Sequence, residues 1–473
     1  LTVGKWILAH AQVPFAEHWN MFALSKPWVA YSWSNEVLFA WFDGVFGAHG
    51  LLVLKILLGV GITFSFAYCY SRICEDWFIG LLIGALVTAG CYGHFTLRPQ
   101  SLVWCYFIWA LYWADQIRSE GLTRKSSLFL VLIFCAWANA HITTAIGLFA
   151  VTLWVYDREE LPRTVLVALL CLMGTFLTPY LGAEWLVFLG KSNHPFQHAS
   201  IMEFQPANIL QYPTGVLLFL SIWVLVFLIR RPFAVAYSQL VVVGVMFFGA
   251  LVVVKFIPFA VIVLGLLLAD MWRSSGTYRN AFGNLGEAVE RLRTFTARIP
   301  REGLTFVFLC SAIVSVVKVW REPIDTAVTP VHAVDFFLKE QLPHPVLNDF
   351  GKGGYLMYRL SNDDGTLDYP VAIDGRTNVT PHEIWEKFSK TFHGQYGWSE
   401  FIDAVDPQTI LWRAESPTSN ILLNNTDWCL IYRSGSNEEG YLLFVKHAFY
   451  EANREKYKSE NCDVPSETSL DVS

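Results

Sequence analysis

Ten apolar stretches between residues 49 and 320 constrain the fold of this chain more than any other feature. Seven approach the length needed for the roughly 30 Å core of a bilayer, and three are shorter, at 127–140, 142–156 and 164–179. Only 16% of the residues are charged, against about 25% in ordinary soluble domains. The pattern predicts an α-helical polytopic membrane domain of about ten helices over 49–324 and excludes an ordinary soluble protein. The seven longer stretches are 49–71, 77–95, 101–117, 213–229, 235–254, 256–271 and 303–320.

The basic residues of the connecting loops predict the topology, because Lys and Arg accumulate on the cytoplasmic side of short loops. One alternate set of loops holds 14 Lys and Arg residues, and the other set, together with the segment before residue 49, holds five. Ten crossings then place the N-terminal segment and everything after residue 321 outside, in the periplasm of a Gram-negative bacterium. The chain starts at Leu1 without a signal peptide, so we expect at least one earlier transmembrane helix to precede it.

The charge balance changes at residue 325. From there to the end the chain has 23 acidic and 12 basic residues, whereas the part before it has 17 and 22. Short β-type runs alternate with helical stretches from His344 onward, which predicts a small extracytoplasmic α/β domain at 325–452 and a disordered tail at 453–473. Neither part has the basic character that nucleic-acid binding requires. The predicted strands are 345–348, 355–360, 371–374, 409–412, 428–432 and 441–445, and the predicted helices are 381–393, 398–404 and 418–424.

Glycines and cysteines give weaker signals. The Gly351, Gly353, Gly354 cluster does not match a dinucleotide-binding pattern and is not expected to open a helix. Asp349, Gly353 to Tyr355 and Ile373 to Arg376 are interpreted mainly as turn and packing residues. Seven of the nine cysteines lie in apolar stretches and predict no disulfide framework, whereas Cys429 and Cys462 could pair.

Polar side chains at membrane depth are costly unless they face a cavity or a partner. In the predicted topology a set of them lies near the outer surface, which predicts one polar, outward-open cavity able to accept an anionic head group. Each also has a simpler interpretation: Arg98 as an interfacial cation, Asn139 and His141 as an inter-helix hydrogen bond, Lys255 as a topology anchor. The set comprises Glu36, His94, Arg98, Gln100, Asn139, His141, Glu203 and Lys255.

The opening segment, 1–48, contains five Trp residues and two Pro residues, which fits helices lying along the membrane interface. Its two glutamates, Glu17 and Glu36, are candidates for a general base that removes a proton from an acceptor hydroxyl. The alternative for each is a solvated carboxylate on an interfacial helix.

Several motifs together resemble a large family of bacterial multi-pass membrane proteins related to the GT-C type of glycosyltransferase. The resemblance covers nearly the whole chain, and Lys255 stands where that family more often has Arg, which loses the bidentate fork. In the family an acidic, Trp-rich segment precedes the first interfacial helix, and Leu1 falls just after that position. The motifs are P-W-V-x-x-S-W-x-x-E, R-P-Q, W-A-N-A-H, T-P-Y, M-E-F-Q-P, K-F-I-P-F, N-D-F-G-K-G-G-Y-L and I-D-G-R.

The resemblance implies an inverting glycosyltransferase at the outer face of the cytoplasmic membrane. It implies a polyprenyl-phosphate-linked sugar as donor, a lipid, glycan or protein as acceptor, Glu36 or Glu17 as catalytic carboxylate, and a divalent metal that is optional rather than indicated. The competing hypothesis is a non-catalytic membrane protein, either a lipid-linked glycan transporter or an assembly partner whose C-terminal domain binds glycan. A transferase needs a base beside the acceptor, whereas a transporter needs a path to the inner leaflet.

Overall fold

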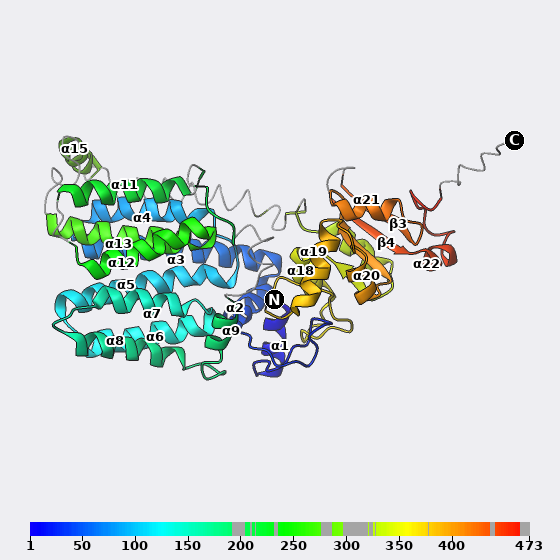
Figure 1. Cartoon of the computed structure of the whole chain (residues 1–473), viewed down its shortest axis with the longest axis horizontal. Helices are drawn as coiled ribbons and strands as arrows, with labels where there is room; N and C mark the ends of the chain where they lie inside the picture. Colours follow the sequence, from blue (N-terminus) through cyan, green and yellow to red (C-terminus); the bar gives the residue numbers. More distant parts are fainter. Residues whose placement is uncertain are drawn as a thin grey trace. The chain divides into compact units, whose positions relative to one another are not determined.

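The computed structural model is mostly helical, with one small sheet, and divides into two compact units. The helical unit comprises Tyr31–Pro323, and the sheet unit comprises Leu1–Ala30 together with Ile324–Ser473 (Figure 1). The residues that the structure describes are 1–191, 204–208, 211–212, 214–230, 235–275, 286–296, 320, 325–326, 328–376, 378–435 and 440–463.

The helical unit is a bundle whose long helices run side by side and alternate in direction (Figure 1). Helix is observed over nine of the ten predicted stretches, and the tenth, 303–320, lies almost entirely outside the described residues. The elements are α2 (Trp33–Phe46), α3 (Ala48–Cys74), α4 (Trp77–Tyr92), η1 (Pro99–Leu102), α5 (Val103–Glu120), α6 (Arg124–Ala140), α7 (Thr144–Val155), α8 (Leu161–Thr175), α9 (Glu184–Lys191), α11 (Thr214–Arg230), α12 (Tyr237–Val252), η3 (Val254–Phe256), α13 (Ile257–Ser275) and α15 (Gly286–Thr296).

Local sequence sets where several of these helices begin. The Asp76 carboxylate accepts hydrogen bonds from the Phe78 and Ile79 amides at the start of α4, which satisfies donors that a helix N-terminus leaves open. Thr123 caps α6 in the same way. Gly80 lets α4 approach α3 closely, because a Cβ there would lie 2.2 Å from the Ser71 backbone.

Two helices in the described part of the chain are long and apolar enough to cross a membrane, by length and composition alone. They are His49–Cys74 and Val254–Ser274. Of the 18 most apolar consecutive residues in each helix, 83% are buried in the second and 33% in the first. Helix α13 therefore forms the centre of the core, while α3 lies at its side. Five further helices are apolar but shorter, at 12 to 17 residues. The number of crossings therefore remains a prediction.

A buried charge network joins α5, α12 and α13 at one end of the bundle. Arg273 donates to both carboxylate oxygens of Asp115, at 2.8 and 3.3 Å, and also to Asp270. The Asp115 side chain is fully buried. Arg118 and the Gln239 amide donate to the other oxygen of Asp270, at 3.3 and 3.0 Å. Two carboxylates thus face two guanidinium groups, and we call these residues the charge network.

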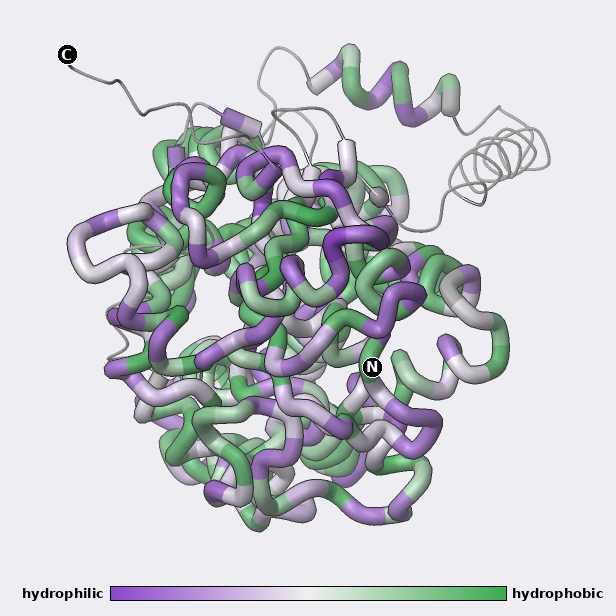
Figure 2. The backbone as a smooth tube through the Cα atoms, turned by 90° about the vertical axis from the view of Figure 1, so that its right-hand side faces the viewer, coloured by the Kyte–Doolittle hydropathy of each residue, from purple (hydrophilic) through white to green (hydrophobic). Residues whose placement is uncertain are grey.

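The sheet unit is built on a four-stranded sheet in the order β1-β2-β4-β3, where β1 (Val346–Asn348) is parallel to β2 (Thr409–Arg413) and the other pairs are antiparallel. Hydrophilic and hydrophobic residues alternate over short stretches of this unit (Figure 2). The remaining elements are β3 (Trp428–Ser434), β4 (Tyr441–Lys446), α1 (Thr2–His10), α17 (Val331–Lys339), α18 (Phe350–Leu360), α19 (His382–Phe392), α20 (Glu400–Val405), α21 (Pro417–Leu423) and α22 (His447–Ala452).

Two predicted strands are wrong. Residues 355–360 belong to helix α18, which starts at Phe350. The three-glycine cluster lies in its first turns, so the expectation that this cluster does not open a helix is also wrong. Position 353 requires glycine because α18 passes close to the backbone at residue 373. A Cβ there would lie 2.0 Å from the Ile373 carbonyl oxygen. Residues 371–374 form no strand among the described residues, where Val371 makes only an isolated bridge to Asn20.

Both ends of the sheet unit differ from the predicted boundaries. The predicted interfacial segment 1–48 divides, because Leu1–Ala30 pack with the C-terminal residues and α2 belongs to the helical unit. The predicted disordered tail is ordered through Asp463. Asn461 accepts a hydrogen bond from the Leu430 amide and donates to the Trp428 carbonyl, at 2.9 and 2.8 Å. Cys429 and Cys462 form a disulfide, and residues 464–473 lie outside the described chain.

Candidate functional site

One amide side chain ties together two motifs that are far apart in sequence. Asn35, in the first turn of α2, donates to the carbonyl of Pro99 at 2.7 Å and to the carbonyl of Ala140 at 3.0 Å. The Ser34 hydroxyl donates to the Asn139 carbonyl at 2.8 Å. The start of α2 is therefore fastened to both the Arg-Pro-Gln turn and the turn that contains His141. We call this end of the helical unit the Asn35 junction.

Glu36 follows Asn35 directly in α2. Its side chain is half-buried, and one carboxylate oxygen accepts a hydrogen bond from the Ser32 hydroxyl at 3.0 Å. The hydroxyl holds that oxygen in a defined orientation. A carboxylate has the chemistry of a general base, which must lie within hydrogen-bond reach of the proton it removes.

Asn139 is engaged in packing. Its side-chain oxygen accepts a hydrogen bond from the Trp33 indole at 2.8 Å. Its side-chain nitrogen donates to the backbone carbonyls of Cys135 and Leu177, at 2.8 and 3.0 Å. An amide nitrogen has two donors, and both have partners here. These contacts favour the inter-helix hydrogen bond over substrate binding for this side chain.

His141 ends α6, and its hydrogen bonds define its tautomer. The Thr143 hydroxyl lies 3.0 Å from His141 Nδ1 and accepts from the Trp137 indole at 3.1 Å. The backbone amide of Thr143 donates to Nδ1 at 3.4 Å, so Nδ1 is the acceptor and Nε2 carries a proton. The ring meets Tyr31 edge-on at 5.8 Å between centroids. An imidazole Nε2–H group is a hydrogen-bond donor to an anion.

The predicted cations and their neighbours lie in turns of the helical unit. Arg98 is exposed and precedes η1, where Pro99 takes the first position, and Gln100 is half-buried. Lys255 lies in η3, with its ammonium nitrogen 5.0 Å from the centre of the Phe204 ring. A Cβ on Gly90 would lie 3.0 Å from a side-chain atom of Val261, so the end of α4 that leads to His94 lies beside the start of α13, which follows Lys255. Lys255 therefore lies at the same end of the bundle as the turn that leads into Arg98.

The structure thus brings the 98–100 turn and the 139–141 turn together at the start of α2, the helix that carries Glu36, and the close approach of Gly90 to Val261 puts Lys255 at the same end of the bundle. Glu203 lies outside the described residues. An outward-open cavity at this end stays a prediction. Asn35, which organises the junction, was missed at the sequence level, because an amide beside a candidate acid carries no signal of its own.

Glu17 belongs to the other unit and is held in a buried ion-pair network. Its side chain is 1% exposed. Arg376 donates to both of its oxygens at 2.9 Å, and the amides of Trp19 and Asn20 donate at 2.8 and 2.9 Å. The carboxylate is therefore closed off from solvent and already accepts four N–H groups of the protein itself. This geometry argues against Glu17 as the base.

Asp374 and two indole rings complete this network around Arg376. Asp374 accepts from the Arg376 guanidinium at 2.8 and 2.9 Å. The guanidinium carbon lies 4.9 and 5.6 Å from the ring centres of Trp28 and Trp19. Burial alone would lower the pKa of Arg376, but Asp374 and Glu17 raise it above its ordinary value. The Ile-Asp-Gly-Arg motif therefore fixes the N-terminal segment to the sheet unit, in line with its interpretation as structural.

A second buried charged cluster lies at the carboxyl ends of β1 and β2. Asp349 is buried, and its Oδ2 atom lies 3.6 Å from Arg413 Nε. Burial raises the pKa of Asp349 and lowers that of Lys352, although the two groups partly offset each other. At the start of α18 the side chain of Asp349 makes no capping hydrogen bond, and the amides of Lys352 and Gly353 donate instead to its backbone carbonyl, at 3.1 and 3.2 Å.

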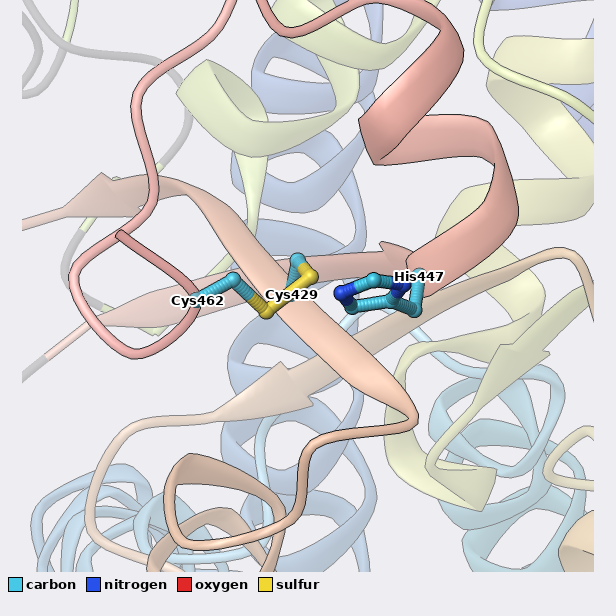
Figure 3. Close-up of side chains that lie close together, drawn as sticks. All are labelled: Cys429, His447 and Cys462. Carbon is cyan, nitrogen blue, oxygen red and sulfur yellow. A yellow bond between two sulfur atoms is a disulfide. The ribbon is translucent and has the colours of Figure 1, made fainter. Parts of the chain in front are cut away.

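Cys429, His447 and Cys462 are the one group of three potential metal ligands among the described residues. The two sulfur atoms are joined in the disulfide (Figure 3), so in this state they are not thiolate ligands. Comparison with protein-family models and with curated proteins finds no match to this chain.

Proposed function

We propose that this protein is a membrane glycosyltransferase that transfers a sugar from a polyprenyl-phosphate-linked donor to an acceptor hydroxyl at the outer face of a bacterial cytoplasmic membrane. The observation that carries the proposal is the Asn35 junction, which joins the Arg-Pro-Gln turn and the His141 turn beside Glu36. The lipid, glycan or protein acceptor is not specified by these residues.

The proposal includes a polytopic arrangement of the helical unit, with about ten crossings and the C-terminal domain outside. The loop charge bias supports that orientation. Two helices of sufficient length, with shorter apolar helices packed around them, are compatible with it.

Anionic and cationic side chains have different roles in the proposed reaction. Attack by a hydroxyl on the sugar carbon requires removal of its proton, which we assign to Glu36. The departing phosphate carries the developing negative charge, and donors aimed at it stabilise that charge. We assign this task to Arg98 and Lys255, with the Nε2–H group of His141 and the amide of Gln100 as hydrogen-bond donors.

The test separates donor binding from transfer in the full chain, using a radiolabelled polyprenyl-phosphate sugar. Glu36→Gln keeps the size of the side chain but removes the base, so turnover should fall by about 10²-fold or more while donor binding stays the same. Arg98→Ala should weaken donor binding by roughly 10- to 100-fold, the value of a charge-assisted hydrogen bond. Glu120→Gln and Arg124→Ala, both exposed at the other end of the bundle, are the matched controls.

Two outcomes count against the proposal in different ways. Undiminished transfer by Glu36→Gln would remove Glu36 as the base. Failure of the unmodified chain to bind any polyprenyl-phosphate sugar would favour the non-catalytic hypothesis of a glycan transporter or assembly partner.

A further inference from the structure

The Cys429–Cys462 disulfide lies against an imidazole. One ligand atom from each of Cys429, His447 and Cys462 lies within 4.8 Å of the other two, and the three residues come from β3, the start of α22 and the segment after it (Figure 3). Cys429 is buried, whereas His447 is exposed. The mechanism proposed above uses none of these residues.

Contacts other than the disulfide hold the three residues in place. Cys429 pairs with Val445 in the antiparallel β3–β4 ladder, and the amide of His447 donates to the Asp427 carbonyl at 2.9 Å. These contacts fix two of the three ligands through the backbone of the sheet. Neither depends on the sulfur–sulfur bond.

The segment that carries Cys462 is also fastened independently. Its neighbour Asn461 bonds to the amide of Leu430 and the carbonyl of Trp428, on either side of Cys429. The Asp463 carboxylate accepts from the Tyr450 hydroxyl and the Ser459 amide. Opening the disulfide would therefore leave two thiols beside each other and beside His447.

We propose that the dithiol form of this site binds one Zn²⁺ ion through Cys429 Sγ, Cys462 Sγ and a ring nitrogen of His447. Thiolate and imidazole are the ligands that Zn²⁺ prefers, with bonds of about 2.3 and 2.0–2.1 Å. In a tetrahedral site two such ligand atoms stand roughly 3.3–3.8 Å apart, which lies within the spacing of this group. The fourth position belongs to water, because His447 faces solvent.

Conversion of the disulfide into a Zn²⁺ site requires a thiol reductant. Two electrons and two protons from the reductant convert the disulfide into two thiols, and the reductant leaves as its own disulfide. Binding of Zn²⁺ then displaces both protons as the two Zn–S bonds form. Glu451, whose carboxylate oxygen lies 3.7 Å from His447 Nε2, can orient the ring from outside the coordination sphere.

The experiment uses the full chain in detergent, reduced with a thiol that is then removed under anaerobic conditions. Titration with Co²⁺, a spectroscopic substitute for Zn²⁺, should give thiolate-to-cobalt charge-transfer and tetrahedral d–d bands that saturate at one ion per reduced chain. Added Zn²⁺ should abolish the bands, and the disulfide form should show none. Circular dichroism and protease resistance of the reduced, metal-free chain report whether it stays folded.

His447→Ala is the decisive variant because it leaves the disulfide intact. It should weaken Co²⁺ binding by at least about 10-fold, while His393→Ala, which alters an exposed histidine of the same unit, should bind as the unmodified chain does. Equal binding by His447→Ala overturns the proposal. So does a reduced chain that binds no Co²⁺, whether it stays folded or unfolds. None of these readouts depends on glycosyl transfer.

Discussion

Replacement of Arg376 by Met should release the N-terminal segment from the sheet unit. Arg376 makes four side-chain hydrogen bonds to the carboxylates of Glu17 and Asp374, which are 1% and 2% exposed. Met has a similar length but no charge. The substitution therefore leaves two neighbouring buried carboxylates without their cation.

The expected cost follows from that burial. Removing one partner of a buried ion pair typically costs about 3–5 kcal/mol, because the other charge stays desolvated and uncompensated. Loss of the guanidinium over Trp28 and Trp19 acts in the same direction. At 1.4 kcal/mol for each factor of ten, local opening should become at least about 10²-fold more frequent.

Hydrogen exchange measures that opening locally. The amides of Trp19 and Asn20 donate to Glu17, so peptides over residues 15–30 should exchange at least about 10²-fold faster in Arg376→Met. Peptides from the helical unit should not change.

Two controls test whether the loss of protection comes from unpaired buried charge: a substitution in an exposed ion pair, and a second substitution in the Arg376→Met variant. Arg433→Met breaks a pair with Glu460, which is 60% exposed, and should cost no more than about 1 kcal/mol. Adding Glu17→Gln to Arg376→Met should restore part of the protection, because it removes one of the two unpaired charges. Exchange over residues 15–30 within about threefold of the unmodified chain in Arg376→Met would refute the argument from burial.

Two further predictions concern the sheet unit. Gly353→Ala should destabilise it by about 1–3 kcal/mol because the new Cβ meets the Ile373 carbonyl, whereas Gly354→Ala, where nothing lies within 4 Å, should not; urea unfolding of the two variants makes the comparison. Burial lowers the pKa of His344, so just below pH 6.5 the unfolded chain binds more protons than the folded one and stability rises with pH; His344→Phe should reduce this slope between about pH 5 and pH 7, and an unchanged slope would contradict it.

Continuous apolar stretches located most helices of the helical unit, because burial of one continuous core requires apolar side chains along their length. The local pattern misled at α18, where Tyr355, Leu356 and Met357 gave the appearance of a strand and three preceding glycines argued against a helix. The helix forms because Leu356 and Met357 are buried on one face with Gly353. These contacts come from the folded chain and cannot be read from local propensity.

The candidate site was predictable in part. The shared location of Glu36, Arg98 and His141 followed from counting helices, since alternate loops of a bundle lie at the same end. The buried ion-pair network that holds Glu17 was not predictable, because its partner Arg376 lies 359 residues away in the sequence. The packing role of Asn139 likewise depends on Trp33 and Leu177, which nothing in the local sequence connects to it.

In the proposed membrane topology, the two arginines of the charge network have different tasks at different times. Arg118 and Arg273 would contribute to the loop charge bias during insertion, before either has met its carboxylate partners. In the folded bundle Asp115 and Asp270 neutralise both. The same side chains would thus first orient the hairpins and later lock α5 against α13. A charge reversal at Asp115 would consequently disturb assembly after insertion, leaving the orientation of the chain unchanged.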